Sequence, residues 1–124
     1  MKSSRPRHKE VRREFQVRPR LYRGVDIAIG PGKADLLEAV HRAGSIAAAA
    51  ESMGMSYMRA WMLIRTMNSC FKAPLVRTKR GGAERGTAIL TETGRSVLAL
   101  YRRVEMQSLK ATQALRRQLS DRLR

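Results

Sequence analysis

Lysine and arginine are the residues of this sequence with the clearest chemical consequence, because they number 26 against 10 aspartates and glutamates and give a formal net charge of +16. The excess is not confined to one tail, since residues 1–30 contain 9 basic and 3 acidic residues and residues 91–124 contain 8 and 3. A surface of this charge attracts polyanions. The composition therefore predicts a nucleic-acid partner, with an anionic membrane surface as second choice.

Residue types that perform catalysis are scattered through the chain. His8 lies in a charged N-terminal stretch, His41 on the surface of a predicted helix, and Cys70 is the only cysteine. A metal site needs several such residues at close spacing. The glycine-rich segment 81–87 lacks the lysine that a phosphate-binding loop places before its hydroxyl residue. We therefore expect a binding protein and not an enzyme, with no metal or other cofactor of its own.

The positive charges would be positioned mainly by a predicted helix-turn-helix between Gly44 and Asn68. Ser45 and Ser56 can each cap a helix, and Gly54 can supply the turn between the two helices. The alternative is an ordinary helical hairpin whose apolar face is only core. In the helix-turn-helix interpretation, the second helix reads the DNA major groove through Ser56, Tyr57, Met58, Arg59, Met62 and Arg65.

A hairpin is predicted after this segment, from two short β-prone runs, Leu75 to Thr78 and Thr87 to Leu90, that flank a glycine-rich basic loop. A hairpin directly after a recognition helix is the wing of a winged helix. The residues expected to reach phosphates or the minor groove from its tip are Lys79, Arg80 and Arg85. The alternative is a solvated hairpin without a ligand.

The region before the helix-turn-helix is predicted to contain β structure and a supporting helix. Apolar residues fall on odd positions from Phe15 to Ile29, which indicates a strand. Pro19 restricts this strand to a sheet edge, or divides the region into two pieces with a turn near Arg23 and Gly24. A helix is expected from Lys33 to Arg42.

A long C-terminal helix is predicted from Glu92 towards Arg122, capped by Thr91. At about 1.5 Å per residue it would run roughly 45 Å and extend past a small winged domain, so its apolar stripe needs a partner. The simplest partner is the same helix of a second subunit, although a frayed end beyond about Lys110 is the alternative. The stripe proposed for dimerisation consists of Val97, Tyr101, Val104, Ala111, Leu115 and Leu119.

These elements predict a mostly α fold with a small β component, a winged helix-turn-helix with a long C-terminal dimerisation helix. The expected division is a flexible basic arm at 1–14, a DNA-binding domain at 15–90 with its helix-turn-helix at 45–68 and its wing at 75–90, and the dimerisation helix at 91–124. No run approaches the roughly 20 apolar residues that cross a bilayer. We expect a prokaryotic, cytoplasmic and nucleoid-associated protein without a membrane partner.

A family resemblance rests on GSIAAAA at 44–50, MGMSYMRAW at 53–61, MNSCF at 67–71 and ILTETGRSVLALY at 89–101. Together they resemble the N-terminal DNA-binding domain of ModE-type molybdate-responsive transcriptional regulators, with a LysR-like helix-turn-helix. The resemblance implies a winged-helix dimer whose recognition helix begins at Ser56 and Tyr57, with Trp61 packed inside. Full-length members continue into a molybdate-binding domain and this chain ends at Arg124, so molybdate is implied by the resemblance alone.

Three functions are compatible with the sequence. The first is a sequence-specific transcriptional regulator of the ModE type that binds double-stranded DNA as a homodimer, with repression as the simplest action. The second is a sequence-tolerant architectural protein that coats DNA with its evenly spread charge. The third is an adaptor whose C-terminal helix docks a separate effector-binding protein.

Overall fold

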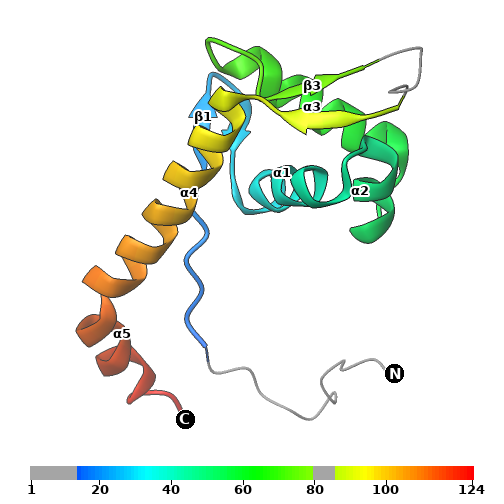
Figure 1. Cartoon of the computed structure of the whole chain (residues 1–124). Helices are drawn as coiled ribbons and strands as arrows, with labels where there is room; N and C mark the ends of the chain where they lie inside the picture. Colours follow the sequence, from blue (N-terminus) through cyan, green and yellow to red (C-terminus); the bar gives the residue numbers. More distant parts are fainter. Residues whose placement is uncertain (1–13, 80–85) are drawn as a thin grey trace.

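The computed structural model describes residues 14–79 and 86–124, which form a mostly helical fold with two small sheets (Figure 1). Its elements in chain order are β1 (Leu21–Arg23), β2 (Asp26–Ile29), α1 (Pro31–Ala43), α2 (Ile46–Ser52), α3 (Tyr57–Cys70), β3 (Val76–Thr78), β4 (Ala88–Leu90), α4 (Glu92–Ala111) and α5 (Gln113–Ser120). The helices α1, α2 and α3 pack together, and α4 runs away from them on one side (Figure 1). This confirms the predicted fold class.

The helix-turn-helix forms where its caps and turn predict it. The Oγ of Ser45 accepts a hydrogen bond from the backbone N–H of Ala48, and the Oγ of Ser56 accepts one from the N–H of Arg59, each at 3.1 Å. Gly54 has a φ of +67°, a left-handed conformation that glycine adopts at little cost. These local interactions fix the ends of α2 and α3 and the turn between them.

The core is built around α1, whose Leu36, Leu37 and Val40 are fully buried. Against it lie small residues of α2 and α3, including Ala49 and Ala60, which are also fully buried. Small side chains let the helices approach closely, as expected from the alanine-rich sequence of α2. The result is a firm inner support for α3.

The N-terminal β structure is the two-piece alternative. β1 and β2 form an antiparallel hairpin, and Gly24 in the turn has a φ of +62°. The prediction of a strand beginning at Phe15 is wrong, since residues 14–20 lie outside any strand and run beside α4 and α5 (Figure 1). The Oη of Tyr101 donates a hydrogen bond to the carbonyl of Pro19 at 2.8 Å, and the Arg116 guanidinium lies 5.9 Å from the centre of the Phe15 ring. Residues 14–20 therefore contact α4 and α5 and do not pair in a sheet.

The C-terminal region is divided at Thr112, so the prediction of one continuous helix from Glu92 to Arg122 is wrong. The Oγ1 of Thr112 donates a hydrogen bond to the carbonyl of Ser108 at 2.6 Å, and the Arg116 guanidinium donates to the carbonyl of Leu109. Side chains that bond to carbonyls of the preceding turn compete with the helical hydrogen bonds and bend the chain. The helix α4 still extends well past the core before this break (Figure 1).

Two contacts fix α3 and α4 to the wing strands. The amide of Asn68 donates to the carbonyl of Val76 at 3.2 Å and accepts from the N–H of Leu75 at 2.7 Å, which ties the end of α3 to β3. At Gly94 the backbone of α4 comes so close to β3 that a Cβ would lie 2.1 Å from the carbonyl oxygen of Leu75. The relative positions of α3, the β3–β4 hairpin and α4 are therefore set by the Asn68 side-chain hydrogen bonds and by the close approach of α4 at Gly94.

Candidate nucleic-acid interface

The outer face of α3 carries apolar side chains that are half or more exposed to solvent. Ala60, Ile64 and Met67 are buried on the inner face, whereas Met58 and Met62 are 61% and 50% exposed. Since successive residues turn by about 100° around a helix, Arg59 and Arg65 flank the two methionines on opposite sides. Tyr57, at the start of the helix, is 53% exposed. The helix thus presents apolar side chains between two cations.

Arg65 is held in place by its own helix. Its guanidinium lies 5.3 Å from the centre of the Trp61 ring, and Trp61 packs against the core. A guanidinium over an indole face gains a cation–π interaction and loses little freedom on binding. The arrangement orients Arg65 at the edge of the exposed face.

Ser56 occupies the cap of α3, so its hydroxyl oxygen accepts from the helix itself. Its hydroxyl hydrogen remains able to donate outward. The structure thus gives Ser56 a structural role in addition to the predicted contact with a ligand.

The wing is an antiparallel hairpin in which Val76 pairs with Leu90 and Thr78 with Ala88. The backbone N–H of Lys79 donates to the carbonyl of Thr87 at 3.0 Å, which continues the ladder to the edge of the described region. Arg80 and Arg85, predicted at the tip, lie outside the described residues. Arg77 is an exposed cation on β3 that sequence reasoning missed, although its place between the buried Val76 and the tip was a usable signal.

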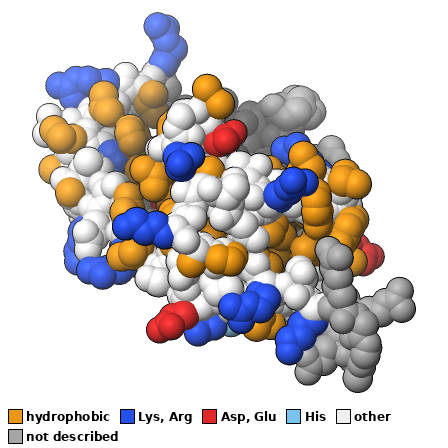
Figure 2. Space-filling view, turned by 90° about the horizontal axis from the view of Figure 1, so that it is seen from above, with side chains coloured by type: hydrophobic (Ala, Val, Ile, Leu, Met, Phe, Trp, Pro, Cys, Tyr) orange, Lys and Arg blue, Asp and Glu red, His pale blue; other side chains and the backbone are white. Residues whose placement is uncertain are grey.

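The face viewed from above in Figure 2 carries Lys and Arg side chains scattered among apolar ones, with few carboxylates. Within residues 14–79 and 86–124, no group of three or more His, Cys, Asp or Glu side chains could hold a metal ion. In the same part of the chain, no helix is both long enough and apolar enough to cross a membrane.

The stripe predicted for dimerisation is only partly exposed. Val104, Leu115 and Leu119 are 49%, 62% and 58% exposed, and Ala111 is exposed as well. Tyr101, in contrast, is buried in its own subunit and bonded to Pro19, and Val97 packs against the core. The assignment of Tyr101 to an exposed dimerisation stripe is therefore wrong, because residues 14–20 cover that side of α4.

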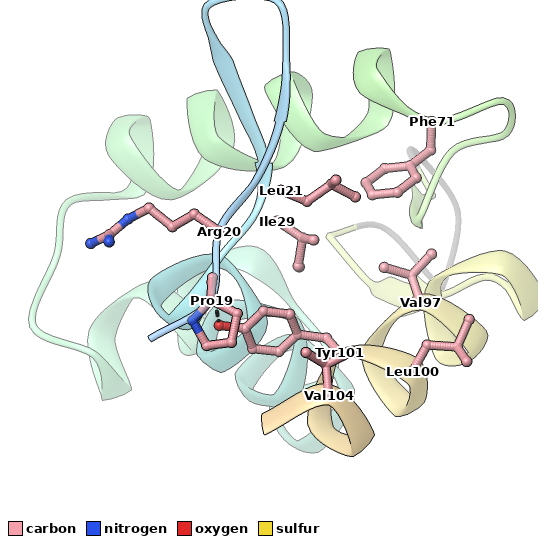
Figure 3. A pocket seen from close by; sticks show the side chains of 9 residues that line it. All are labelled: Pro19, Arg20, Leu21, Ile29, Phe71, Val97, Leu100, Tyr101 and Val104. Atoms are coloured by element: carbon pink, nitrogen blue, oxygen red, sulfur yellow. Dashed lines mark hydrogen bonds between the residues drawn. The ribbon is translucent and has the colours of Figure 1, made fainter. Parts of the chain in front are cut away.

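An apolar groove lies beside this stripe. It has a volume of about 360 Å³ and lies between residues 19–21, Phe71 and α4. Figure 3 shows Leu21, Phe71, Val97 and Leu100 around it, whereas the side chain of Arg20 extends away from it. Leu21 and Leu100 are each 55% exposed, and sequence reasoning missed both as members of this surface.

The direction of α4 is fixed by a cluster of charges around Arg102. Its guanidinium is 2.8 Å from Asp35 and 2.9 Å from Glu38, both on α1, and 3.0 Å from Glu105 on α4. Partial burial alone would lower the pKa of Arg102, but the hydrogen bonds that its guanidinium donates to the carboxylates of Asp35, Glu38 and Glu105 raise the pKa above its ordinary value. Arg102 on α4 therefore links this helix to α1 through ion pairs.

Comparison with known proteins places this geometry in a family. Residues 33–95 match the model for bacterial regulatory helix-turn-helix proteins of the lysR family, which covers half of the chain. The chain belongs to the lysR family. This membership confirms the predicted helix-turn-helix of a bacterial regulatory protein.

Relatives of the lysR-family chain extend the comparison beyond residue 95. The molybdenum transport protein ModE of Azotobacter vinelandii is 37% identical over 107 residues, which are 86% of this chain and 40% of that protein. The molybdenum-pterin-binding protein MopA of Rhodobacter capsulatus is 40% identical over 83 residues, or 67% of this chain and 31% of MopA. The DNA-binding transcriptional dual regulator ModE of Escherichia coli K12 is 37% identical over 71 residues, or 57% of this chain and 27% of that ModE. These matches confirm the resemblance to ModE-type regulators.

Two further facts bound the comparison. The chain spans less than half the length of these curated relatives. A solved structure of the CbnR DNA-binding domain in complex with DNA superimposes with a TM-score of 0.55 at 21% identity, covering 73% of this chain and 97% of that one. This likeness supports the fold.

Proposed function

We propose that this chain is a sequence-specific DNA-binding domain of a ModE-type transcriptional regulator, with α3 as the helix that enters the major groove. The single observation that carries the proposal is the outer face of α3, where Met58 and Met62 are exposed between Arg59 and Arg65. Methionine can contact the methyl group of thymine, and arginine can donate two hydrogen bonds to guanine. The lysR-family match and the relatives named ModE support the same function.

The remaining predicted contacts fit this orientation. Tyr57 and the Ser56 hydroxyl lie at the start of α3, the end that approaches base edges in helix-turn-helix proteins. Lys79, with Arg80 and Arg85 from the loop that follows it, would contact phosphates from the wing. We propose repression as the regulatory action, by occupation of a promoter, in the nucleoid of a prokaryotic cytoplasm.

The protein is proposed to act as a homodimer through α4. The exposed Leu100 and Val104 border the apolar groove. The groove and these two side chains form a continuous apolar surface, whereas single exposed apolar residues are normal on a monomer and need no partner. A second copy of α4 is an occupant of matching chemistry, and a two-fold dimer would place both recognition helices roughly 34 Å apart, one turn of DNA. A separate effector-binding protein in the same groove is the alternative.

Replacement of Arg65 by alanine should weaken operator binding by about 1–3 kcal/mol and binding to random DNA by much less, because a base contact discriminates and a phosphate contact does not. Fluorescence anisotropy with operator and random duplexes measures both affinities. Arg103→Ala is the control, since it removes the same charge from an exposed position on α4. Equal losses on the two duplexes would refute base reading by Arg65.

An architectural, sequence-tolerant function is favoured by one observation, the even spread of the +16 charge. Such a protein would bind operator and random DNA with similar affinity and a steep salt dependence. The ratio of the two affinities therefore discriminates between the two functions.

A further inference from the structure

A second concave surface shares Arg20 with the apolar groove and is otherwise lined by different residues. It has a volume of about 310 Å³ and is bounded by the N-terminal segment, the start of α1, the turn between α2 and α3, and one flank of α3. Four cationic side chains line it, Arg18, Arg20, Lys33 and Arg59, and we call it the basic hollow. The side chain of Arg20 points away from the apolar groove, as Figure 3 shows.

The charges of the basic hollow are only weakly compensated by the described part of the protein, since Asp26 acts on Lys33 without lining the hollow. No carboxylate is among its lining residues. Within residues 14–79 and 86–124, the four side chains make no ion pair and no hydrogen bond, whereas Arg102 has three carboxylate partners. Like charges held close together repel one another, so their convergence from three segments costs stability unless an anion joins them.

Lys33 is partly removed from water at the wall of the basic hollow. Burial is the main reason that the pKa of the Lys33 ammonium is lowered; Cys70 and Asp26 act in the opposite direction, and the charge of Arg59 adds a smaller lowering. The helix α1 also begins here, with Gly30 as a cap that offers no side chain and no acidic residue in the first turn. Its positive end therefore adds to the field of the cations.

The position of the basic hollow relates it to DNA. Arg59 lies in the first turn of α3, the end of the recognition helix proposed to enter the major groove, and Met55 in the preceding turn also lines the hollow. A phosphate of the strand beside that groove would therefore lie near the hollow when α3 is seated. Arginine and lysine are the side chains that bind phosphate most strongly.

We infer that the basic hollow binds a phosphate of the DNA backbone, so that residues 18–20 and the start of α1 form a phosphate contact beside the recognition helix. This inference rests on the proposed function and assigns Arg59 to the backbone instead of a base. A DNA phosphate and a free phosphate or molybdate ion are both tetrahedral oxyanions. A free oxyanion is therefore the competing ligand for the basic hollow.

The test removes two cations without altering α3. Arg18→Gln combined with Lys33→Gln should lower the slope of log affinity against log salt by about 0.9, the value for one phosphate contact on duplex DNA. The ratio of operator to random affinity should stay unchanged, because phosphates carry little sequence information. Arg103→Gln with Arg117→Gln is the matched control, which removes two exposed charges from α4 and α5. A salt slope equal to that of the control would overturn the inference.

A set of operator duplexes with single neutral methylphosphonates locates the contact. At one position the wild-type protein should lose affinity, and the Arg18, Lys33 double variant should lose no more, because the contact is already absent. Losses that add at every position would overturn the inference. The salt slope on random DNA tests the phosphate contact of the basic hollow even if the protein has no operator preference. Failure of this inference can therefore be distinguished from failure of the proposed sequence-specific function.

The free-anion source is tested by calorimetry with inorganic phosphate and with molybdate on the DNA-free protein. We expect weak, unselective binding of both, since the hollow is open to solvent and an enclosed site is needed for tight oxyanion capture. Micromolar, saturable binding of molybdate that the double variant abolishes would overturn the assignment to DNA.

Discussion

Replacement of Gly94 by alanine should destabilise the protein by about 3 kcal/mol, a large part of the 5–15 kcal/mol that holds a typical domain together. The new Cβ would lie 2.1 Å from the carbonyl oxygen of Leu75 and 2.9 Å from its carbonyl carbon. These are backbone atoms, so no side-chain rotation relieves the contact. The helix α4 must shift away from β3, which also strains the hydrogen bond from the Thr91 hydroxyl to the carbonyl of Pro74. Urea denaturation followed by circular dichroism measures the loss.

Gly32→Ala is the matched control for this prediction. Gly32 also lies in the first turn of a helix, and a Cβ there would meet no atom within 4 Å. Its replacement should leave stability unchanged or raise it by up to about 1 kcal/mol, because alanine loses less backbone freedom on folding. If Gly94→Ala were as stable as Gly32→Ala, the close contact between α4 and β3 would not exist in solution.

The double variant Leu100→Asn, Val104→Asn should be monomeric and should lose operator affinity by about 100-fold or more, because linked half-sites no longer bind together. Both side chains are about half exposed in one chain, so the winged domain should remain folded. Sedimentation velocity gives the assembly state and anisotropy gives the affinity for a two-fold operator.

Met106→Asn is the control for the dimer surface, since Met106 is 67% exposed and lies about half a turn away from Val104 on the same helix. It should remain dimeric with unchanged affinity. A Leu100, Val104 double variant that sediments as a dimer would exclude this surface as the interface. A monomeric variant with full operator affinity would leave α4 to an adaptor function.

The parts of the fold that sequence alone predicted are those fixed by neighbours in the chain. Ser45, Gly54 and Ser56 act within a few residues of themselves, so the bounds of α2 and α3 followed from residue types. The exposed residues of α3 followed from helical spacing in the same way. The wing strands were also local, because a loop of turn-forming residues separates two β-prone runs.

What sequence could not predict depends on distant segments. Tyr101 shares the apolar period of α4, and only its contact with Pro19 distinguishes it from an exposed residue. The break at Thr112 comes from a threonine bonding to the turn before it, an interaction that the residue type permits without requiring it. The basic hollow brings together residues 18, 33 and 59, which are too far apart in the sequence for a local pattern to connect them. The close contact at Gly94 likewise needs the position of Leu75.

The most direct test of the proposed function is selection of genomic DNA fragments by the purified chain, followed by affinity measurement on the best site and on a scrambled duplex at physiological salt. We expect a shared two-fold sequence among the selected fragments and an affinity ratio of about 1,000 or more. The contacts on α3 predict that Arg65→Ala lowers this affinity ratio by about 5- to 150-fold, the equivalent of about 1–3 kcal/mol. Fragments without a common sequence, bound within a few fold of the scrambled duplex, would contradict sequence-specific recognition by α3.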